Sequence, residues 1–172
     1  MPDDTSRIAA QRLATQVLAA CRQQQIMLAT AESCTGGLVS AALTAIAGSS
    51  DVMERGFVTY SNEAKSEMLG VHAALISAHG AVSQQVAEAM ARGALAHSRA
   101  GIAVSITGIA GPGGGSMEKP VGLVHLACAL AGHETRALKR LYGALPRDDI
   151  RAAAVCDALQ LVLDMLAGSK PG

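Results

Sequence analysis

Segments of this chain with apolar residues at helical spacing alternate with short, continuous apolar runs. Apolar side chains recur at roughly helical spacing over residues 8–21, which predicts a first helix. The apolar run 26–31 is typical of a buried strand. A polar, glycine-containing turn at 32–37 follows it and leads into an apolar helix expected at 38–47. This order places the turn at a helix start, where α/β proteins hold ligands.

The remaining segments continue the alternation of helices and strands. A glycine-rich loop is expected at 108–120 and a tail at 168–172. Further strands are predicted at 57–60, 101–107, 121–131 and 135–141. Further helices are predicted after Ser61 and after Ser83, each with the serine as its N-cap, the second to about residue 100, and from Pro146 to about residue 167. This order predicts an α/β fold, namely a three-layer α/β/α domain with a mostly parallel, mixed sheet.

The composition favours one globular domain and disfavours nucleic acid or an anionic membrane as its partner. A length of 172 residues fits a single domain over residues 1–172, with a structured core from about 8 to 166. Lys plus Arg and Asp plus Glu both number 14, and this zero net charge argues against nucleic acid or an anionic membrane as partner. The longest apolar stretch, residues 121–131, is too short to cross a bilayer.

The four cysteines indicate a reducing compartment. They lie far apart with no C-x-x-C pair, and no histidine cluster has the spacing of metal ligands. The polar N-terminus carries no secretory signal pattern. We therefore expect reduced thiols in a cytoplasmic protein without a metal site.

Two neighbouring residues of the turn 32–37 are candidate nucleophiles. Ser33 fits either a nucleophile or a helix N-cap, and the pattern alone favours the cap, because serine is a preferred N-cap residue. Cys34 is intrinsically more nucleophilic, but a small buried thiol is the more common role of a cysteine at such a position.

Lys65 and Tyr60 acquire a chemical role only through their surroundings. By default Lys65 is a solvated helix lysine, but facing Ser33 in a partly desolvated site it becomes a base with a lowered pKa. Tyr60 fits either a packed strand aromatic or a hydroxyl offered to a site. Phe57 and Tyr60 fall on opposite faces of an extended strand. We expect Tyr60 to face the ligand and Phe57 to face the core or its rim.

The glycine-rich loop and two arginines indicate a phosphate-bearing ligand. Residues 107–115 contain five glycines after a predicted strand, yet neither a Walker A pattern nor G-x-G-x-x-G can be drawn through them. We interpret the loop as backbone N–H groups that approach a phosphate, with a tight turn as the alternative. Arg147 and Arg151 lie one helical turn apart and fit either an anion site or exposed ion pairs.

Several motifs in series resemble one known family, in their order and spacing, from about residue 8 to about residue 166. They are TAESCTGG (30–37), IAGSS (46–50), ERGFVTYSNEAK (54–65), GAVS (80–83) and SITGIAGPGGG with KPVG (105–122). These motifs are similar to the CinA C-terminal domain family of nicotinamide-mononucleotide deamidases.

The resemblance implies a metal-independent, cofactor-free amidohydrolase that converts nicotinamide mononucleotide and water to nicotinate mononucleotide and ammonia. It implies Ser33 as nucleophile, with Lys65 and Tyr60 as its catalytic partners, and backbone N–H groups near 34–37 as oxyanion donors. It also implies a small-molecule nucleotide as partner and a dimer or higher homo-oligomer. Substrate contacts are expected at matching motif positions: Thr35, Gly36, Gly37, Asn62, Thr107, Gly108, Gly111, Gly113, Gly114, Arg147 and Arg151.

Two other functions stay open at this point. The first is a non-catalytic nucleotide-binding module linked to competence or to the DNA-damage response, which predicts ligand binding without turnover. The second is direct DNA binding, which the zero net charge disfavours.

Overall fold

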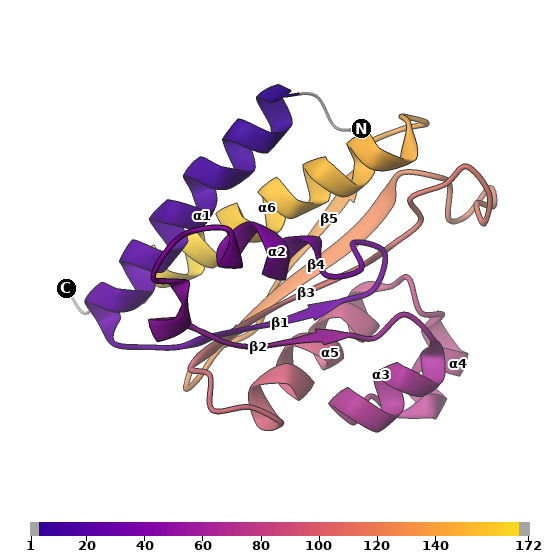
Figure 1. The fold of residues 1–172 in the computed structure, drawn as a ribbon. Coiled ribbons are helices and arrows are strands. Elements are labelled where there is room, and N and C mark those ends of the chain that lie inside the picture. Colours follow the sequence, from indigo (N-terminus) through magenta and orange to yellow (C-terminus); the bar gives the residue numbers. More distant parts are fainter. Residues whose placement is uncertain (1–3, 169–172) are drawn as a thin grey trace.

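Five strands form one sheet that carries helices on both faces (Figure 1). The structure is a computed structural model that describes residues 4–168 of the chain. In chain order its elements are α1 (Asp4–Gln24), β1 (Leu28–Glu32), α2 (Leu38–Thr44), the short 3-10 helix η1 (Ser49–Asp51), β2 (Met53–Val58), α3 (Asn62–Leu69), α4 (Ala73–His79), α5 (Gln84–Ala96), β3 (Ile102–Gly108), β4 (Leu123–Leu130), β5 (Arg136–Leu141) and α6 (Arg147–Gly168).

The sheet is mixed, with the strand order β2-β1-β3-β4-β5. β1 pairs in parallel with both β2 and β3, whereas β4 runs antiparallel to β3 and β5. The mixed sheet is therefore confirmed, and its four pairings divide evenly between the two types. β1 and β3 lie inside the sheet and are buried along almost their whole length, as expected for strands that helices cover on both faces.

Two helical layers enclose the sheet, and this confirms the three-layer α/β/α architecture. One apolar cluster joins α1, α2 and α6 to one face of the sheet, with Val17, Ile106 and Leu159 fully buried in it. The other cluster joins α3, α4 and α5 to the opposite face around Phe57 and Met90. Among residues 4–168, no helix has the length and apolarity needed to cross a membrane.

Several element boundaries differ from the sequence-based prediction. β2 begins at Met53 rather than at 57, because an edge strand pairs on one side only and its exposed residues break the apolar pattern. The predicted helix 38–47 ends at Thr44, and the helix that begins after Ser83 ends at Ala96 rather than near 100. α4 was not predicted. Of the predicted tail, only Gly168 lies within the described residues, where it ends α6.

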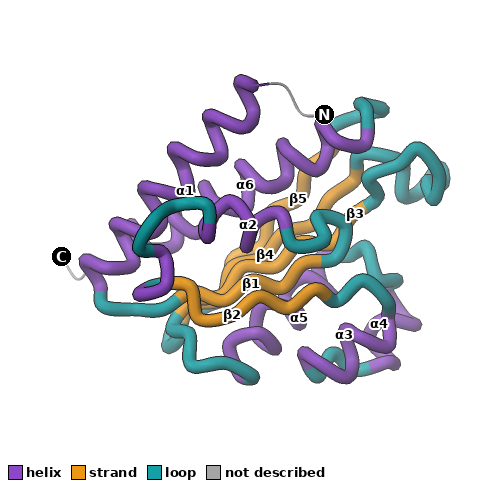
Figure 2. Tube along the Cα trace, in the orientation of Figure 1, coloured by secondary structure: helices purple, strands orange, loops and turns teal. Residues whose placement is uncertain are grey.

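Three connecting segments meet at one edge of the sheet. They are the turn 33–37 after β1, the residues 59–61 after β2 and the glycine-rich loop 109–122 after β3 (Figure 2). Because β1, β2 and β3 run parallel, their carboxyl ends lie at the same edge. Sequence motifs more than 70 residues apart therefore converge there, since residue 33 and residue 109 follow neighbouring strands.

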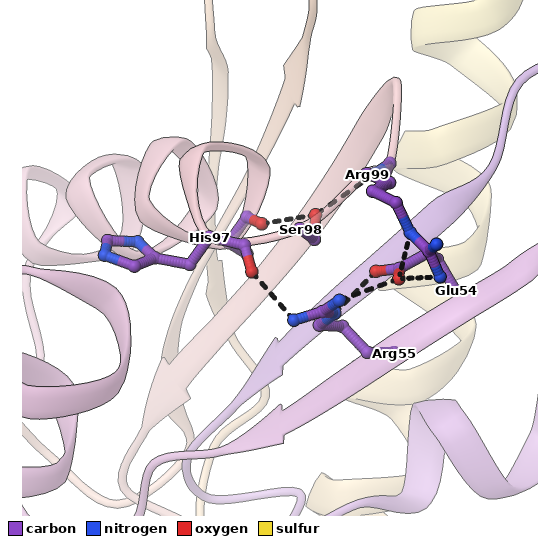
Figure 3. Close-up of polar contacts among 7 residues, drawn as sticks. Glu54, Arg55, His97, Ser98 and Arg99 are labelled. Carbon is purple, nitrogen blue, oxygen red and sulfur yellow. Dashed lines mark hydrogen bonds and ion pairs between the residues drawn. The ribbon is translucent and has the colours of Figure 1, made fainter.

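An ionic cluster ties the edge strand β2 to the turn between α5 and β3 at the other end of the sheet (Figure 3). The Glu54 carboxylate accepts from Arg55 Nε at 2.6 Å and lies 3.3 Å from Arg99 Nη2. Arg55 Nη1 also donates to the His97 carbonyl at 3.0 Å. Hydrogen bonding from Arg55 lowers the pKa of Glu54 from its ordinary 4.5 to about 2. The Glu54 side chain is 2% exposed, so it is held tightly between the two arginines.

Glu54→Gln is expected to lower the melting temperature at neutral pH by removing the carboxylate that both arginines share. The contribution of Glu54 is present above its unfolded pKa of about 4.5 and is lost as the pH falls through its folded pKa of about 2. The difference in melting temperature between the two proteins should therefore shrink as the pH drops from 5 toward 2. Thermal unfolding followed by circular dichroism measures it, with Glu134→Gln on the exposed β4–β5 turn as control; a pH-independent difference would contradict this role.

Candidate active site

The turn after β1 places Ser33 beside the start of α2. Gly36 and Gly37 have φ values of +59° and +104°, which glycine adopts without strain, and the chain reverses sharply there. Ser33 is half-buried, while the neighbouring Cys34 is 7% exposed and packs in the core. Burial raises the pKa of the Cys34 thiol to about 11, so it stays protonated at neutral pH. The hydroxyl of Ser33, not the thiol, is thus the available nucleophile of this turn.

Lys65 projects from the first turn of α3 onto Ser33. Ser61 caps this helix, its hydroxyl accepting from the Ala64 N–H at 3.0 Å, as the sequence predicts. Side chains on a helix point toward its N-terminus, so Lys65 Nζ folds back onto the chain that enters α3. There it lies 3.0 Å from Ser33 Oγ and 3.0 Å from the Thr59 carbonyl. Ser33 and Lys65 are 32 residues apart in the sequence, and the pairing of β1 with β2 brings them together.

The Lys65 amine is buried without a counter-ion. The residue is 1% exposed, and among residues 4–168 no carboxylate lies within ion-pair distance of Nζ. Its other neighbours are the carbonyls of Tyr60 and Ser61, at 3.4 and 3.5 Å. Burial lowers the pKa of Lys65 from its ordinary 10.5, because desolvation penalises the ammonium form. A neutral Lys65 can donate to carbonyls and still turn its lone pair toward the Ser33 hydroxyl.

Glu32 fills the start of α2 with its carboxylate. It is fully buried and accepts five hydrogen bonds. The donors are the Thr35 hydroxyl at 2.7 Å, the N–H groups of Gly37, Val39 and Ser40, and the Ser40 hydroxyl. The predicted substrate contacts through Thr35 and Gly37 are thus engaged within the protein, by the same carboxylate.

Tyr60 and Arg147 meet at the rim of the site. Tyr60 is 61% exposed, whereas Phe57 is buried against α5, so the two aromatics do point to opposite faces. Arg147 Nη2 donates to the Tyr60 hydroxyl at 3.0 Å, and its Nη1 donates to the Gly111 carbonyl at 2.7 Å. This exposed arginine therefore joins the segment after β2 to the glycine-rich loop, and the Tyr60 hydroxyl bonds Arg147 rather than Lys65.

Arg151 and Thr107 have protein partners of their own. Arg151 donates from Nε to the Cys34 carbonyl at 3.2 Å and from Nη2 to the Thr35 carbonyl at 3.1 Å. Thr107 is buried, and its hydroxyl donates to the Ala81 carbonyl at 2.8 Å. Both residues therefore support the loops of the site through these hydrogen bonds.

The other predicted substrate contacts lie at three kinds of position. Gly108 packs against β4, where an added Cβ would lie 2.7 Å from Val124 Cγ2, so strand packing explains this glycine. Gly113 and Gly114 are exposed in the outer part of the glycine-rich loop. Gly36 is exposed in the turn after Ser33, and Asn62 is exposed at the first position of α3.

Sequence reasoning missed two contributors to the site. Glu32 stands within the quoted motif beside Ser33, but its place in the predicted polar turn gave no sign that its buried carboxylate would cap α2. The Thr59 carbonyl, which accepts from Lys65, carries no side-chain signal at all. Among the described residues, no group of three histidine, cysteine, aspartate or glutamate side chains is placed to hold a metal ion.

The fold and this geometry define an α/β protein with a serine–lysine pair at the carboxyl end of its parallel strands. The family model of the CinA C-terminal domain matches residues 10–166, and the chain belongs to that family.

Named relatives fall into two groups by length. The chain is 51% identical over 149 residues to the nicotinamide-nucleotide amidohydrolase PncC of Escherichia coli K12, covering 87% of this chain and 90% of that one. It is 55% identical over 126 residues to a CinA-like protein of Akkermansia muciniphila, covering 73% of this chain. Of that longer protein and of a similar one from Syntrophobacter fumaroxidans, the chain spans only 30% and 34%.

Solved structures share the fold. The crystal structure of the competence/damage inducible protein CihA from Agrobacterium tumefaciens superposes with a TM-score of 0.89 at 51% identity, covering 92% of this chain and 96% of that one. A competence damage-inducible protein A from Klebsiella pneumoniae also gives a TM-score of 0.89, at 35% identity and 94% coverage of this chain.

Proposed function

We propose that this chain hydrolyses the carboxamide of nicotinamide mononucleotide, releasing ammonia and nicotinate mononucleotide. The observation that carries the proposal is the 3.0 Å contact between Ser33 Oγ and the buried, unpaired Lys65 amine. Its pairing with a nucleophilic hydroxyl is the arrangement that serine–lysine amide hydrolysis needs. The likeness to the PncC amidohydrolase over 87% of the chain supports the choice of substrate.

The first half of the reaction forms an ester on Ser33. Ser33 Oγ attacks the carboxamide carbon while its proton passes to the neutral Lys65 amine. The carbonyl oxygen becomes an oxyanion, which backbone N–H groups of the turn stabilise. When the tetrahedral intermediate collapses, the carbon–nitrogen bond breaks and Lys65 returns the proton to the leaving nitrogen. Ammonia departs, and the nicotinoyl group stays bound to Ser33.

The second half restores the enzyme. Water attacks the ester carbon while Lys65 accepts its proton. Collapse of the second intermediate breaks the bond to Ser33 Oγ, which takes the proton back from Lys65. The cationic pyridinium ring of the substrate also favours an unprotonated Lys65, since like charges repel. We assign Tyr60 to the rim of this site, where its hydroxyl bonds Arg147 and its carbonyl lies near Lys65 Nζ.

The substrate phosphate falls on the Arg147 side of the site in this proposal. Arg147 is exposed, and within residues 4–168 it bonds only the Tyr60 hydroxyl and the Gly111 carbonyl, both of which a phosphate can replace as acceptors. The exposed glycines 113 and 114 leave the neighbouring backbone open to a ligand. We also propose that Gly36, Gly108 and Asn62, the remaining predicted substrate contacts, belong to the nucleotide-binding site.

The purified protein, incubated with nicotinamide mononucleotide and a chelator, tests the proposal. We expect stoichiometric ammonia and nicotinate mononucleotide, with undiminished turnover in the chelator. Release of free nicotinamide would indicate cleavage of the glycosidic bond instead. Binding of the nucleotide without any turnover would favour the non-catalytic module.

Arg147→Gln is expected to raise KM for nicotinamide mononucleotide about 10–100-fold with little change in kcat. A charge-assisted hydrogen bond contributes about 1.5–3 kcal/mol, and ~1.4 kcal/mol is a factor of ten. Steady-state ammonia release measures it. Nicotinamide riboside, which lacks the phosphate, should show no such change. Arg92→Gln on the exposed face of α5 is the matched control, and an unchanged KM in Arg147→Gln would refute the phosphate contact.

We further propose that the chain forms a single domain, and that the protein works in the cytoplasm as a homo-oligomer. All four cysteines are free thiols, and three of them are buried, which suits a reducing compartment. Exposed apolar side chains beside the site, Leu38, Val58 and Tyr60, offer a surface that a second copy of the chain would cover. Sedimentation at micromolar concentration tests the oligomeric state.

A further inference from the structure

Two backbone N–H groups in the turn after Ser33 have no hydrogen-bond partner among residues 4–168. They belong to Cys34 and Thr35. The flanking amides are all engaged: Ser33 N–H donates to the Ile106 carbonyl and Gly36 N–H to the Ser33 carbonyl, both at 3.0 Å, and Gly37 N–H donates to Glu32. The donors left for an oxyanion are therefore these two, a narrower set than the whole turn 34–37.

The direction of each free N–H is fixed through the carbonyl of its own peptide unit. A trans peptide is planar, so its N–H points opposite to its C=O. The Thr35 N–H shares a peptide unit with the Cys34 carbonyl, which Arg151 Nε holds at 3.2 Å. The Cys34 N–H shares one with the Ser33 carbonyl, which the Gly36 N–H holds. Arg151 thus orients the Thr35 N–H away from α6.

The guanidinium of Arg151 is directed at the turn after Ser33 and at a carboxylate of its own helix. Its Nε and Nη2 reach the carbonyls of Cys34 and Thr35, and its Nη1 lies 3.7 Å from the Asp148 carboxylate. Two of its three nitrogens therefore bond carbonyls of the turn behind Ser33, and the third lies near a carboxylate, which disfavours a phosphate there. This differs from Arg147, which is exposed and bonds two groups at the rim.

Glu32 holds the same turn from the opposite side. Its carboxylate accepts the Thr35 hydroxyl and the first free amides of α2. A buried carboxylate placed there neutralises the partial positive charge of the helix start, so α2 cannot serve the oxyanion. Of the N–H groups in the turn 33–37, those of Cys34 and Thr35 are then the ones left to meet the negative charge developed in the reaction.

We propose that Arg151 and Glu32 are positioning residues, which hold the turn at Cys34 and Thr35 so that the free N–H groups of these two residues serve as the oxyanion donors for Ser33. The inference rests on the proposed deamidase function and changes the expected role of Arg151 from substrate ligand to support of the transition state. Residues that act only in the transition state alter kcat, whereas residues that bind the substrate equally throughout alter KM.

Steady-state kinetics of Arg151→Gln and Arg147→Gln with nicotinamide mononucleotide separate the two roles. Removing an oxyanion donor outright lowers kcat about 10²–10³-fold, so misorienting one should lower it about 10–100-fold in Arg151→Gln, with KM within about threefold. Arg147→Gln should show the reverse. Arg151→Lys, which keeps the charge and reaches one carbonyl, should recover part of kcat.

A rise in KM with unchanged kcat in Arg151→Gln would make it a substrate ligand and overturn the inference, as would unchanged kinetics. Glu32→Gln provides the second arm, with the same expected fall in kcat, because an amide nitrogen cannot accept the hydrogen bonds that the carboxylate accepts. Melting temperatures identify any variant that fails to fold. If Arg151→Gln does not fold, the kinetics of Arg151→Lys decide whether Arg151 is a positioning residue or a substrate ligand. An unmodified protein that releases no ammonia would refute the proposed function and this inference together.

Discussion

Replacing Ser33 with alanine is expected to lower kcat for ammonia release from nicotinamide mononucleotide by about 10⁴–10⁶-fold, the range seen when the nucleophile of a serine hydrolase is removed. The reason is that the acyl ester forms on Ser33 Oγ, and among residues 4–168 no other hydroxyl lies within hydrogen-bond distance of Lys65 Nζ. The substrate should still bind, since its phosphate contacts are elsewhere. Single-turnover ammonia release together with a binding isotherm measures both quantities.

Cys34→Ala is the matched control for this variant. The thiol lies next to Ser33 in sequence, but it is buried and its pKa is raised to about 11, so it is not a thiolate at neutral pH. Cys34→Ala should retain most of the activity. Full activity in Ser33→Ala, with loss in Cys34→Ala, would transfer the nucleophile to the thiol and refute the assignment.

Lys65→Met is expected to lower kcat by about 10³-fold or more, because it keeps the length of the side chain but removes the proton acceptor. Lys65→Arg should be similarly impaired, since a guanidinium stays protonated. Lys139→Met, at an exposed position of β5, controls for the loss of a positive charge. Steady-state ammonia release measures all three, and an active Lys65→Met would remove the lysine from the mechanism.

The pH dependence of the unmodified enzyme follows from the same residue. Burial lowers the pKa of Lys65, and the working form is the neutral amine. The value of kcat/KM should therefore rise with pH through this lowered pKa and level off above it. The rise in kcat should occur at lower pH than the rise in kcat/KM, because the bound pyridinium cation further disfavours the ammonium form of Lys65. A rate that falls as the pH rises through this range would contradict a neutral Lys65.

Local patterns in the sequence predicted most of the elements around the site. The serine caps are confirmed at Ser61 and Ser83, whose hydroxyls accept from the N–H three residues later. The order strand, turn and helix over 26–47 is confirmed, although β1 covers 28–32 rather than 26–31 and α2 ends at Thr44. The edge strand was found only in part, because Glu54 and Arg55 interrupt its apolar pattern while forming an ionic cluster. The seven-residue helix α4 is too short to show a clear helical period.

The roles of polar residues were much less predictable than the elements that carry them. Arg147 and Arg151 lie on one helix with the same chemistry, and nothing local separates them. In the fold, Arg147 reaches the exposed rim while Arg151 reaches the carbonyls behind Ser33. Glu32 opens the predicted polar turn 32–37 without a distinctive signal, although its carboxylate accepts five hydrogen bonds from that turn and from the start of α2.

The sequence by itself determined the α/β alternation, the caps and the glycine turn after β1, because these depend on residues within a few positions of one another. The motif resemblance indicated Ser33 and Lys65 as partners. Only the tertiary structure decided the strand order and the 3.0 Å contact between those two side chains. It also set the loss of water around Lys65 that lowers its pKa. Such contacts depend on which strands pair and which helices cover them, and desolvation arises from the whole packed environment rather than from neighbouring residues in the chain.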